Sequence, residues 1–219
     1  SNTCGISWEH QLNTATKTYE ATIEWTAPAS VDAEATGAEG EHDGNYYVEY
    51  KLGELDLSSF TKMYQIKPNG EVSELTANTD KNLWFKTNGQ VEGSHVFLVK
   101  QGGTWYTATI TYPEVETATF KPVDSIGIHD GKVYEGYKLM AGEDQIDLVA
   151  SNIESMTVLE PGATEPKTLT VGDDSDPLLW FNVQKATGDY KYTVKTKVGK
   201  VYEATIEWTA PASVDAEAT

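Results

Sequence analysis

The stretch that decides the fold is Tyr19-Glu-Ala-Thr-Ile-Glu-Trp-Thr-Ala-Pro-Ala-Ser-Val-Asp-Ala-Glu-Ala-Thr36, which recurs without a difference at Tyr202–Thr219. The second copy begins 183 residues after the first (202 − 19). Because that offset is too long for one turn of a solenoid, the repeating unit is expected to be a pair of domains. A looser third version, Trp105-Tyr-Thr-Ala-Thr-Ile-Thr-Tyr112, supports this interpretation. The sequence is therefore expected to be a window from an array of repeated modules.

Turn signals divide the rest of the chain into short alternating segments. Asn-Gly and Asp-Gly pairs supply the positive φ angles of tight hairpin turns, and the segments between them alternate apolar and polar residues. The turn signals are Asp43-Gly44, Asn69-Gly70, Asn88-Gly89, Gly102-Gly103 and Asp130-Gly131. Helix signals are almost absent. The pattern predicts an all-β chain of two tandem, small, antiparallel β-sandwich modules.

The module boundaries follow from landmarks that occur twice in the same order. The landmarks are Tyr50-Lys-Leu52 and Tyr137-Lys-Leu139, Leu83-Trp-Phe85 and Leu179-Trp-Phe181, and a closing aromatic-x-Ala-Thr-Ile strand. They predict a module A over about 26–112 and a module B over about 113–208. Residues 1–25 are expected to be part of a preceding module or an edge strand, and 209–219 the start of a next repeat, a linker or a donor segment.

The two identical strings are expected to form the same β-strand from Tyr to Trp. The apolar residues of these strands are expected to cover a sheet or to lie where the strand pairs with another one. These residues are Tyr19, Ile23, Trp25, Tyr202, Ile206 and Trp208. Two interpretations of the first copy stay open. It packs as an additional edge strand or linker of module A, or it crosses to a neighbouring molecule and links copies head to tail.

Charge narrows the classes of partner. The chain has 16 Lys and no Arg against 34 Asp and Glu, and its net charge is −18. Nucleic-acid binding needs a basic face, so nucleic acid is not expected as a partner. No apolar run reaches the roughly 20 residues needed to span a bilayer. An acidic, Arg-free composition suits an extracellular or cell-surface protein, although biased codon usage explains it equally well.

Catalytic motifs are missing from the sequence, so the chain is not expected to be an enzyme. The histidines lack zinc-site spacing and are expected to be structural or exposed; they are His10, His42, His95 and His129. The single cysteine, Cys4, excludes an intramolecular disulfide. It is a free thiol, an acylated residue or an intermolecular link.

One acidic turn suggests a cation site. Asp173, Asp174 and Asp176 precede Leu178-Leu-Trp-Phe181, and clustered carboxylates on a turn can ligate calcium. The spacing does not match an EF-hand loop, so a solvated acidic turn is the alternative. No other cofactor is expected.

Aromatic residues suggest a second kind of site. Trp84 and Trp180 recur at matching places and are expected to fill the cores, a duplicated binding platform being the alternative. Trp105 and Tyr106 follow the Gly102-Gly103 turn, where exposed rings could stack on sugars. A glycan or a surface protein is therefore a candidate partner.

Part of the chain resembles a known family. The residues that carry the resemblance run from Tyr50-Lys-Leu52 to Gly70 and include Thr76-Ala-Asn78, Leu83-Trp-Phe85, Asn88-Gly-Gln-Val91 and His95-Val-Phe97. They resemble a domain family of unknown function from secreted multidomain proteins of gut anaerobes, often found beside polysaccharide-degrading enzymes. The resemblance implies an extracellular β module with an accessory role such as glycan contact.

Three functional hypotheses follow. The first is a non-enzymatic secreted or cell-surface protein whose β modules form an adhesive or spacer array. The second is an accessory carbohydrate-binding module. The third is a filament subunit assembled by strand donation, with self-association through the terminal strands.

Overall fold

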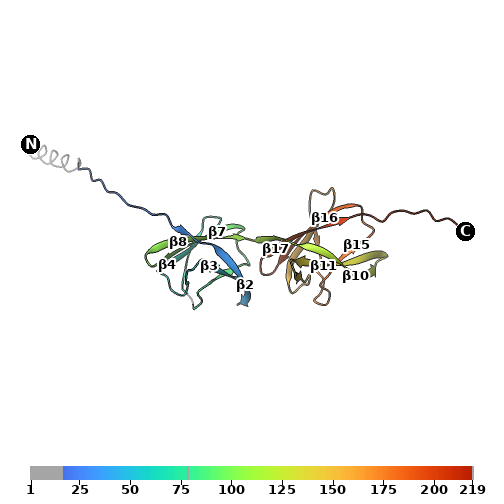
Figure 1. The fold of residues 1–219 in the computed structure, drawn as a ribbon, viewed down its shortest axis with the longest axis horizontal. Helices are drawn as coiled ribbons and strands as arrows, with labels where there is room; N and C mark the ends of the chain where they lie inside the picture. The colour runs from blue at the N-terminus through green and yellow to red at the C-terminus, as the bar shows by residue number, and fades with distance from the viewer. Residues whose placement is uncertain (1–16, 78, 219) are drawn as a thin grey trace, which may run out of the picture.

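The chain folds into β-sheets alone in the part that the structure covers. The structure, a computed structural model, describes residues 17–77 and 79–218; Cys4 and His10 lie outside this range. Within it there is no helix, and so none that could cross a membrane. Figure 1 shows two groups of sheets side by side along the long axis, with the chain leaving at opposite ends. The all-β prediction is confirmed.

Module A consists of two sheets that face each other. The five-stranded sheet has the order β1 (Ala29–Ser30), β8 (Thr104–Tyr112), β7 (Gly93–Gln101), β4 (Lys62–Ile66) and β5 (Val72–Leu75). The three-stranded sheet has the order β2 (Ala33–His42), β3 (Asn45–Leu52) and β6 (Leu83–Lys86).

Module B repeats this arrangement. Its five-stranded sheet has the order β14 (Lys167–Leu169), β13 (Ile153–Leu159), β16 (Gly188–Thr196), β17 (Lys200–Trp208) and β9 (Glu114–Thr117). Its four-stranded sheet joins β10 (Thr119–His129), β11 (Lys132–Ala141) and β12 (Asp144–Ile146), and β15 (Leu179–Asn182) also pairs with β11. Among the described residues of module A, no strand corresponds to the short β12.

Each module has its own core, because alternate residues of both sheets point inward. Leu52, Phe85 and Val99 are buried in module A, and Leu139, Phe181 and Val194 are their counterparts in module B. The two clusters of buried residues share no member. Edge-to-face ring contacts add to both cores, as between Phe181 and Tyr190 with ring centres 5.0 Å apart.

The strand registers match the landmarks read from the sequence. Tyr50 pairs with Leu83 in module A, and Tyr137 pairs with Leu179 in module B. One step along, Trp84 and Trp180 occupy the same register position on β6 and β15. The expectation that these two tryptophans fill the cores is wrong. Neighbouring residues of a strand point to opposite faces, so Phe85 and Phe181 take the core and the indoles lie half-buried on the outer faces.

The direction of the first strand in each module sets the path of the chain. β1 pairs in parallel with β8, and β9 pairs in parallel with β17. Because the opening and closing strands run the same way, the chain enters a module at one end and leaves it at the other. The modules are therefore arranged in a line (Figure 1).

The two identical strings have different structures, contrary to the expectation that both form the same strand. In the second copy, Tyr-to-Trp lies within β17; in the first, the same residues form no strand. Ile206 is 5% exposed and Ile23 is 88% exposed. The residue pattern alone favours a strand in both copies, but a strand also needs neighbouring strands that pair with its backbone N–H and C=O groups. The second copy has such neighbours, β16 and β9, whereas Tyr19 to Trp25 belong to no sheet.

The separate cores predict that damage stays local. Phe85→Ala removes a buried ring that touches Tyr50 and Phe97, and we expect it to destabilise module A by about 3–5 kcal/mol. Hydrogen exchange should show lost protection in β7 and unchanged protection in β16, and Phe181→Ala should give the reverse. Equal loss in both strands for either variant would contradict two independent cores.

Candidate functional site

The outer face of the five-stranded sheet of module A carries an aromatic pair. Trp105 lies half-buried on β8, and its ring stacks against Tyr64 of β4 with centres 6.5 Å apart and planes at 30°. The Lys100 ammonium lies 5.8 Å from the Trp105 ring centre. Leu98 pairs with Tyr64 in the adjacent strand and faces the same side. These residues form a small apolar platform, with Lys100 and, on the same face of β4, Lys62 beside it.

The predicted partnership of Trp105 with Tyr106 does not occur on this platform. Adjacent residues on β8 point to opposite faces, so Tyr106 lies on the inner side, near Ser30 and Val31. Tyr64 takes the place expected for Tyr106. The sequence gives no sign of this, because Tyr64 and Trp105 meet only through the register of β4, β7 and β8.

The acidic turn of module B gives each of its carboxylates a separate partner. Asp173 accepts hydrogen bonds from the Ser175 hydroxyl and then from the Ser175 amide, and these lower the pKa of its carboxyl group. Asp174 accepts from the Ser151 amide, 3.0 Å away. Among residues 17–77 and 79–218, no group of three acidic, His or Cys side chains is placed to hold a metal ion.

Asp176 has a structural partner instead. Its Oδ2 accepts a hydrogen bond from the Trp180 indole at 2.5 Å, and its Oδ1 accepts from the Leu178 amide. Module A repeats the first bond: Trp84 Nε1 donates to Asp80 Oδ2 at 2.8 Å. An Asp four residues before each Trp thus satisfies the one polar atom of a half-buried indole. This repeated spacing is visible in the sequence.

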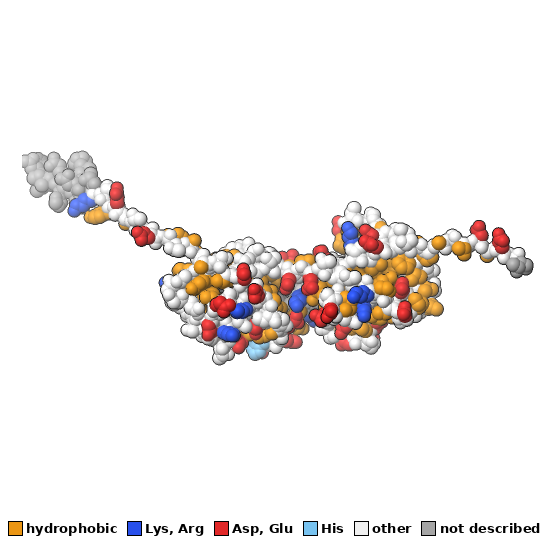
Figure 2. All heavy atoms as spheres, in the orientation of Figure 1, with side chains coloured by type: hydrophobic (Ala, Val, Ile, Leu, Met, Phe, Trp, Pro, Cys, Tyr) orange, Lys and Arg blue, Asp and Glu red, His pale blue; other side chains and the backbone are white. Residues whose placement is uncertain are grey.

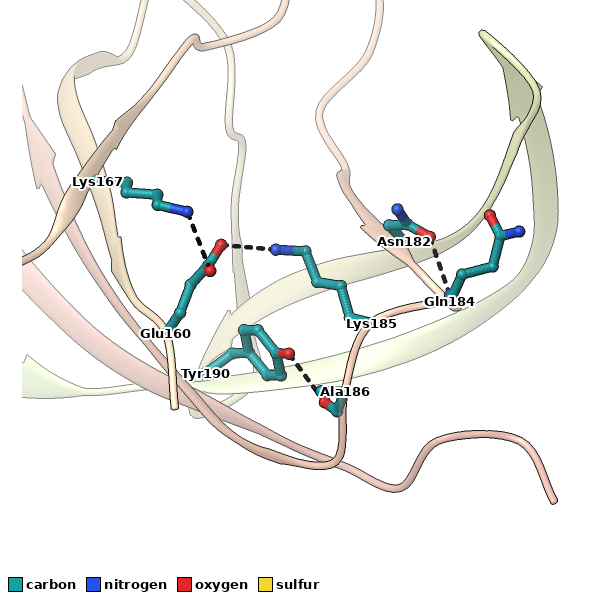
Figure 3. Close-up of polar contacts among 7 residues, drawn as sticks. All are labelled: Glu160, Lys167, Asn182, Gln184, Lys185, Ala186 and Tyr190. Carbon is teal, nitrogen blue, oxygen red and sulfur yellow. Dashed lines mark hydrogen bonds and ion pairs between the residues drawn. The ribbon is translucent and has the colours of Figure 1, made fainter. Parts of the chain in front are cut away.

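A cleft in module B lies near the edges of its two sheets. It measures about 460 Å³, and its lining combines apolar Met156 and Val158 with charged Glu160, Lys167 and Lys185. Figure 3 shows Glu160 between the two lysines. Its carboxylate oxygens lie 2.8 Å from Lys185 Nζ and 3.1 Å from Lys167 Nζ. Glu160 therefore ties β14 and the turn after β15 to the end of β13.

The ionisable groups that line this cleft are poorly suited to proton transfer near neutral pH. Hydrogen bonds from Lys185 and then Lys167 lower the pKa of Glu160, so its carboxylate stays ionised at neutral pH. Burial raises the pKa of the lining residue Tyr192, so its phenol stays protonated. A carboxylate held ionised by two ammonium groups is a poor proton donor. The cleft has the chemistry of a structural or polar binding site.

The histidines are structural or exposed, as expected, in the part of the chain described here. His95 is fully buried beside Phe85; its Nδ1 lies 3.0 Å from Gln65 Nε2, and its Nε2 lies 2.6 Å from the Val91 carbonyl oxygen. Gln65 donates, so Nε2 carries the proton and both ring nitrogens are satisfied. His42 and His129 lie exposed beside the aspartates of the two matching Asp-Gly turns.

The junction between the modules is tight. β8 ends at Tyr112 and β9 begins at Glu114, so Pro113 alone separates them. Lys200 Nζ of module B lies 3.3 Å from Glu39 Oε1 of module A. Burial alone would lower the pKa of Lys200, but Tyr202 in its ionised form and the Glu39 carboxylate outweigh burial, and the pKa is raised. The ammonium therefore stays protonated at this contact.

Packing at the junction is close enough to exclude a side chain. Gly199, at the β16–β17 turn, has φ +84, and a Cβ there would lie 2.8 Å from Thr87 Cβ and 2.9 Å from the Tyr112 ring. The Lys195 ammonium lies 5.8 Å from the centre of the same ring. The turn of module B thus packs directly on the end of module A.

The Glu160 contacts predict a pH-dependent stability. Because the pKa of Glu160 is lowered by folding, its contribution is present above the pKa of an unfolded glutamate and is lost as pH falls through the folded value. We expect Glu160→Gln to reduce the free energy of unfolding at pH 7 by less than about 1 kcal/mol, because the contacts of Glu160 with Lys185 and Lys167 are partly exposed, and so to lower Tm slightly. Near pH 2, where the carboxyl group is protonated in both the folded and the unfolded chain, we expect no difference in Tm.

Glu154→Gln is the matched control for this variant, since Glu154 lies 3.7 Å from Lys195 on a more exposed site. Its Tm should stay near that of the unmodified chain at both pH values. A Glu160→Gln difference that is as large near pH 2 as at pH 7 would show that the contacts with Lys185 and Lys167 are not electrostatic.

Comparisons with known proteins show similarity to solved structures alone. No family model matches the sequence, so the resemblance of Tyr50 to Phe97 to a domain family of gut anaerobes is not found by this comparison, and no curated protein matches either. A Bacteroides ovatus mixed-linkage glucan utilization locus protein, SGBP-B, in complex with a mixed-linkage heptasaccharide, is 15% identical with a TM-score of 0.30, over 86% of this chain and 45% of that one. The BSP domain of a biofilm-associated protein is 16% identical with a TM-score of 0.25, over 78% and 28%. A tetra-tandem repeat from the extending region of a large adhesion protein is 12% identical with a TM-score of 0.23, over 84% and 50%.

Proposed function

We propose that this chain is a non-enzymatic extracellular or cell-surface protein whose β-sandwich modules form a stiff spacer in a longer array. The observation that carries the proposal is the junction: Pro113 alone separates β8 from β9, and Gly199, Thr87 and Tyr112 pack across it. Flexible linkers of several residues would let modules reorient, and none is present here. Because the last strand of module A runs into the first strand of module B through one residue, we expect the two modules to keep one orientation relative to each other.

The acidic surface supports a partner other than nucleic acid, because nucleic-acid binding needs a basic face. Figure 2 shows acidic side chains over both modules. With a net charge of −18, neighbouring copies repel one another, which keeps closely spaced molecules apart. In the described residues the cleft of module B offers an ionised carboxylate and a protonated phenol, a combination that supports binding or structure better than catalysis.

Small-angle X-ray scattering tests the spacer role. We expect one narrow distribution of molecular length, equal at low and high salt, because the partly exposed Lys200–Glu39 pair contributes little and packing holds the junction. A variant with a Gly-Ser linker inserted between Tyr112 and Pro113 should show a broader distribution. If the unmodified chain is as broad as that variant, the modules are not stiffly joined and the spacer role fails.

A matched pair of glycines separates packing at the junction from backbone strain. Gly199→Ala and Gly103→Ala both place a side chain at positive φ, +84 and +81, which costs about 1–2 kcal/mol each. The added methyl of Gly103→Ala meets no atom within 4 Å, whereas that of Gly199→Ala meets Thr87 and Tyr112. We therefore expect Gly199→Ala alone to change the scattering profile. Equal profiles for the two variants would show that the junction contacts do not set the geometry.

A second candidate function, glycan contact, is favoured by the stacked Trp105–Tyr64 pair. Sugar rings bind flat aromatic faces through their apolar CH groups, and Lys100 beside the pair supplies a polar contact. An adhesive array would then hold its ligand on the broad face of module A. The spacer role does not depend on this platform.

Affinity electrophoresis in gels that contain soluble polysaccharides tests glycan contact. Trp105→Ala and Tyr64→Ala should both abolish any retardation and leave Tm nearly unchanged, because neither ring belongs to the core cluster. Trp25→Ala is the control, since it removes an indole that is exposed elsewhere on the chain. Retardation that Trp25→Ala removes as well, or no retardation of the unmodified chain by any polysaccharide, would exclude this function for the platform.

A further inference from the structure

The cleft of module B differs from the equivalent cleft of module A. In module B it lies between the edge strands β14 and β15 and measures about 460 Å³. The matching strands of module A, β5 and β6, border a cleft of about 200 Å³. Apolar residues at the same register positions line both clefts: Met156, Leu169 and Leu179 in module B, and Met63, Leu75 and Leu83 in module A. The additional space in module B is therefore not explained by a different apolar core.

Three lysines line the module B cleft at positions where module A has uncharged residues. They are Lys132, Lys167 and Lys185. The strand registers and the matching bonds of Gln184 and Asn88 place Asn45, Ser73 and Gly89 at the equivalent positions. Among the described residues that line the smaller cleft, none is charged. One module of this acidic pair thus gathers three of the 16 lysines of the chain around one cleft.

The carboxylate in this cleft leaves ammonium donors available. Glu160 accepts one hydrogen bond from Lys167 and one from Lys185, as Figure 3 shows. An ammonium group has three N–H donors, so each of these two lysines retains two of them. Lys132 forms no ion pair in the part of the chain that the structure describes. An anion that enters the cleft therefore finds both positive charge and hydrogen-bond donors.

Trp180 adds a fixed aromatic surface to the same lining. A Cβ atom at Gly127 or Gly136 would lie 3.4 or 3.3 Å from Trp180 Cζ3, so the two glycines let the indole lie close to the backbone of β10 and β11. The bond from Trp180 Nε1 to Asp176 Oδ2 fixes the orientation of the ring, and it occupies one of the carboxylate oxygens of Asp176. Aromatic rings held in this way bind the apolar CH groups of sugar rings.

We propose that the module B cleft binds a saccharide that carries a carboxylate, such as a hexuronate unit of an acidic polysaccharide. The sugar ring packs on Trp180, and its carboxylate accepts hydrogen bonds from Lys132 and from the remaining donors of Lys185. Thr168 and Asn182, which also line the cleft, are partners for the sugar hydroxyl groups. The volume lies within the roughly 300–1,000 Å³ of small-molecule sites. This site depends neither on the spacer role nor on the Trp105 platform.

An NMR titration of the isotope-labelled full-length chain tests the proposal. The probes are oligosaccharides of galacturonate, glucuronate, mannuronate and guluronate, in a buffer with a chelator so that calcium does not bridge two anions. We expect at least one of them to shift the amide signals of β14 and β15 and to leave those of β5 and β6 unchanged. The same oligosaccharide with its carboxylates reduced to alcohols should bind about tenfold or more weakly, because it lacks the charge that the lysines recognise.

Substitutions of charged residues separate the cleft from the general charge of the chain. Lys132→Gln changes an exposed side chain, and we expect it to raise the dissociation constant of the hexuronate about fivefold or more. Lys51→Gln is the matched control, since it removes a lysine of module A that pairs with the exposed Glu54, and it should have no effect. Glu160→Gln removes the carboxylate that competes for Lys167 and Lys185, so it should tighten binding.

The two equivalent tryptophans form a second matched pair. Each indole donates to an aspartate four residues earlier, so Trp180→Leu and Trp84→Leu remove the same structural contact. We expect only Trp180→Leu to weaken binding, by about fivefold or more, because only its cleft carries lysines. Hydrogen exchange in β16 checks that module B stays folded, and if Trp180→Leu loses that protection, Lys132→Gln alone decides.

Four results would overturn the proposal. They are no shift of β14 and β15 by any of the four hexuronates, equal affinity for the charged and the reduced oligosaccharide, an unchanged dissociation constant for Lys132→Gln, and weaker binding by Glu160→Gln. A polyglutamate peptide of equal charge is the remaining probe. Tighter binding of this peptide than of every hexuronate would assign the cleft to acidic peptides instead of acidic sugars.

Discussion

The parallel pairing of the first strand with the last strand is the constraint on which the rest of this structure depends. β1 lies beside β8 and β9 lies beside β17, in the same direction. An antiparallel pair would bring the entrance and exit of a module to the same end, and successive modules would fold back on one another. The parallel pair sends the chain forward, and the inter-module contacts at Tyr112 and Gly199 follow from that path.

The same constraint gives the repeated string its two-sided character. A closing strand and the next opening strand are continuous in the chain, so a short string holds part of two modules. Pro113 alone separates Tyr112 from β9, whereas Thr26, Ala27 and Pro28 separate Trp25, the equivalent of Trp208, from β1.

The fold must also protect its unpaired sheet edges, because a long strand lies at the edge of each of the two smaller sheets. β2 and β10 each have a neighbour on one side only, and exposed edges of this kind invite uncontrolled pairing. Both strands carry a register shift, between Ala35 and Glu39 and between Pro122 and Ile126. Proline and bulges bend an edge away from a flat template, so these strands are poor sites for unspecific addition.

Much of the fold could be predicted from the sequence, because its signals are local. Asp43 and Asp130 adopt φ 50 at the two matching Asp-Gly turns, and the Leu-Trp-Phe runs form strands at matching registers. Partnerships between distant strands could not be predicted. Trp105 meets Tyr64 through the register of three strands, and Tyr19 to Trp25 have strand-like residues without a neighbour. An identical string therefore has two structures, because secondary structure here depends on which strand lies beside it.

The parallel pairs also determine how the molecule bears tension. A pull on the two ends of a module draws the opening and closing strands past each other, so their hydrogen bonds resist together, in shear, instead of opening one after another. Module B has four residue pairs in this clamp, from Glu114 to Thr117, while module A has two, at Ala29 and Ser30. From these numbers of paired residues, we expect module A to yield before module B under load.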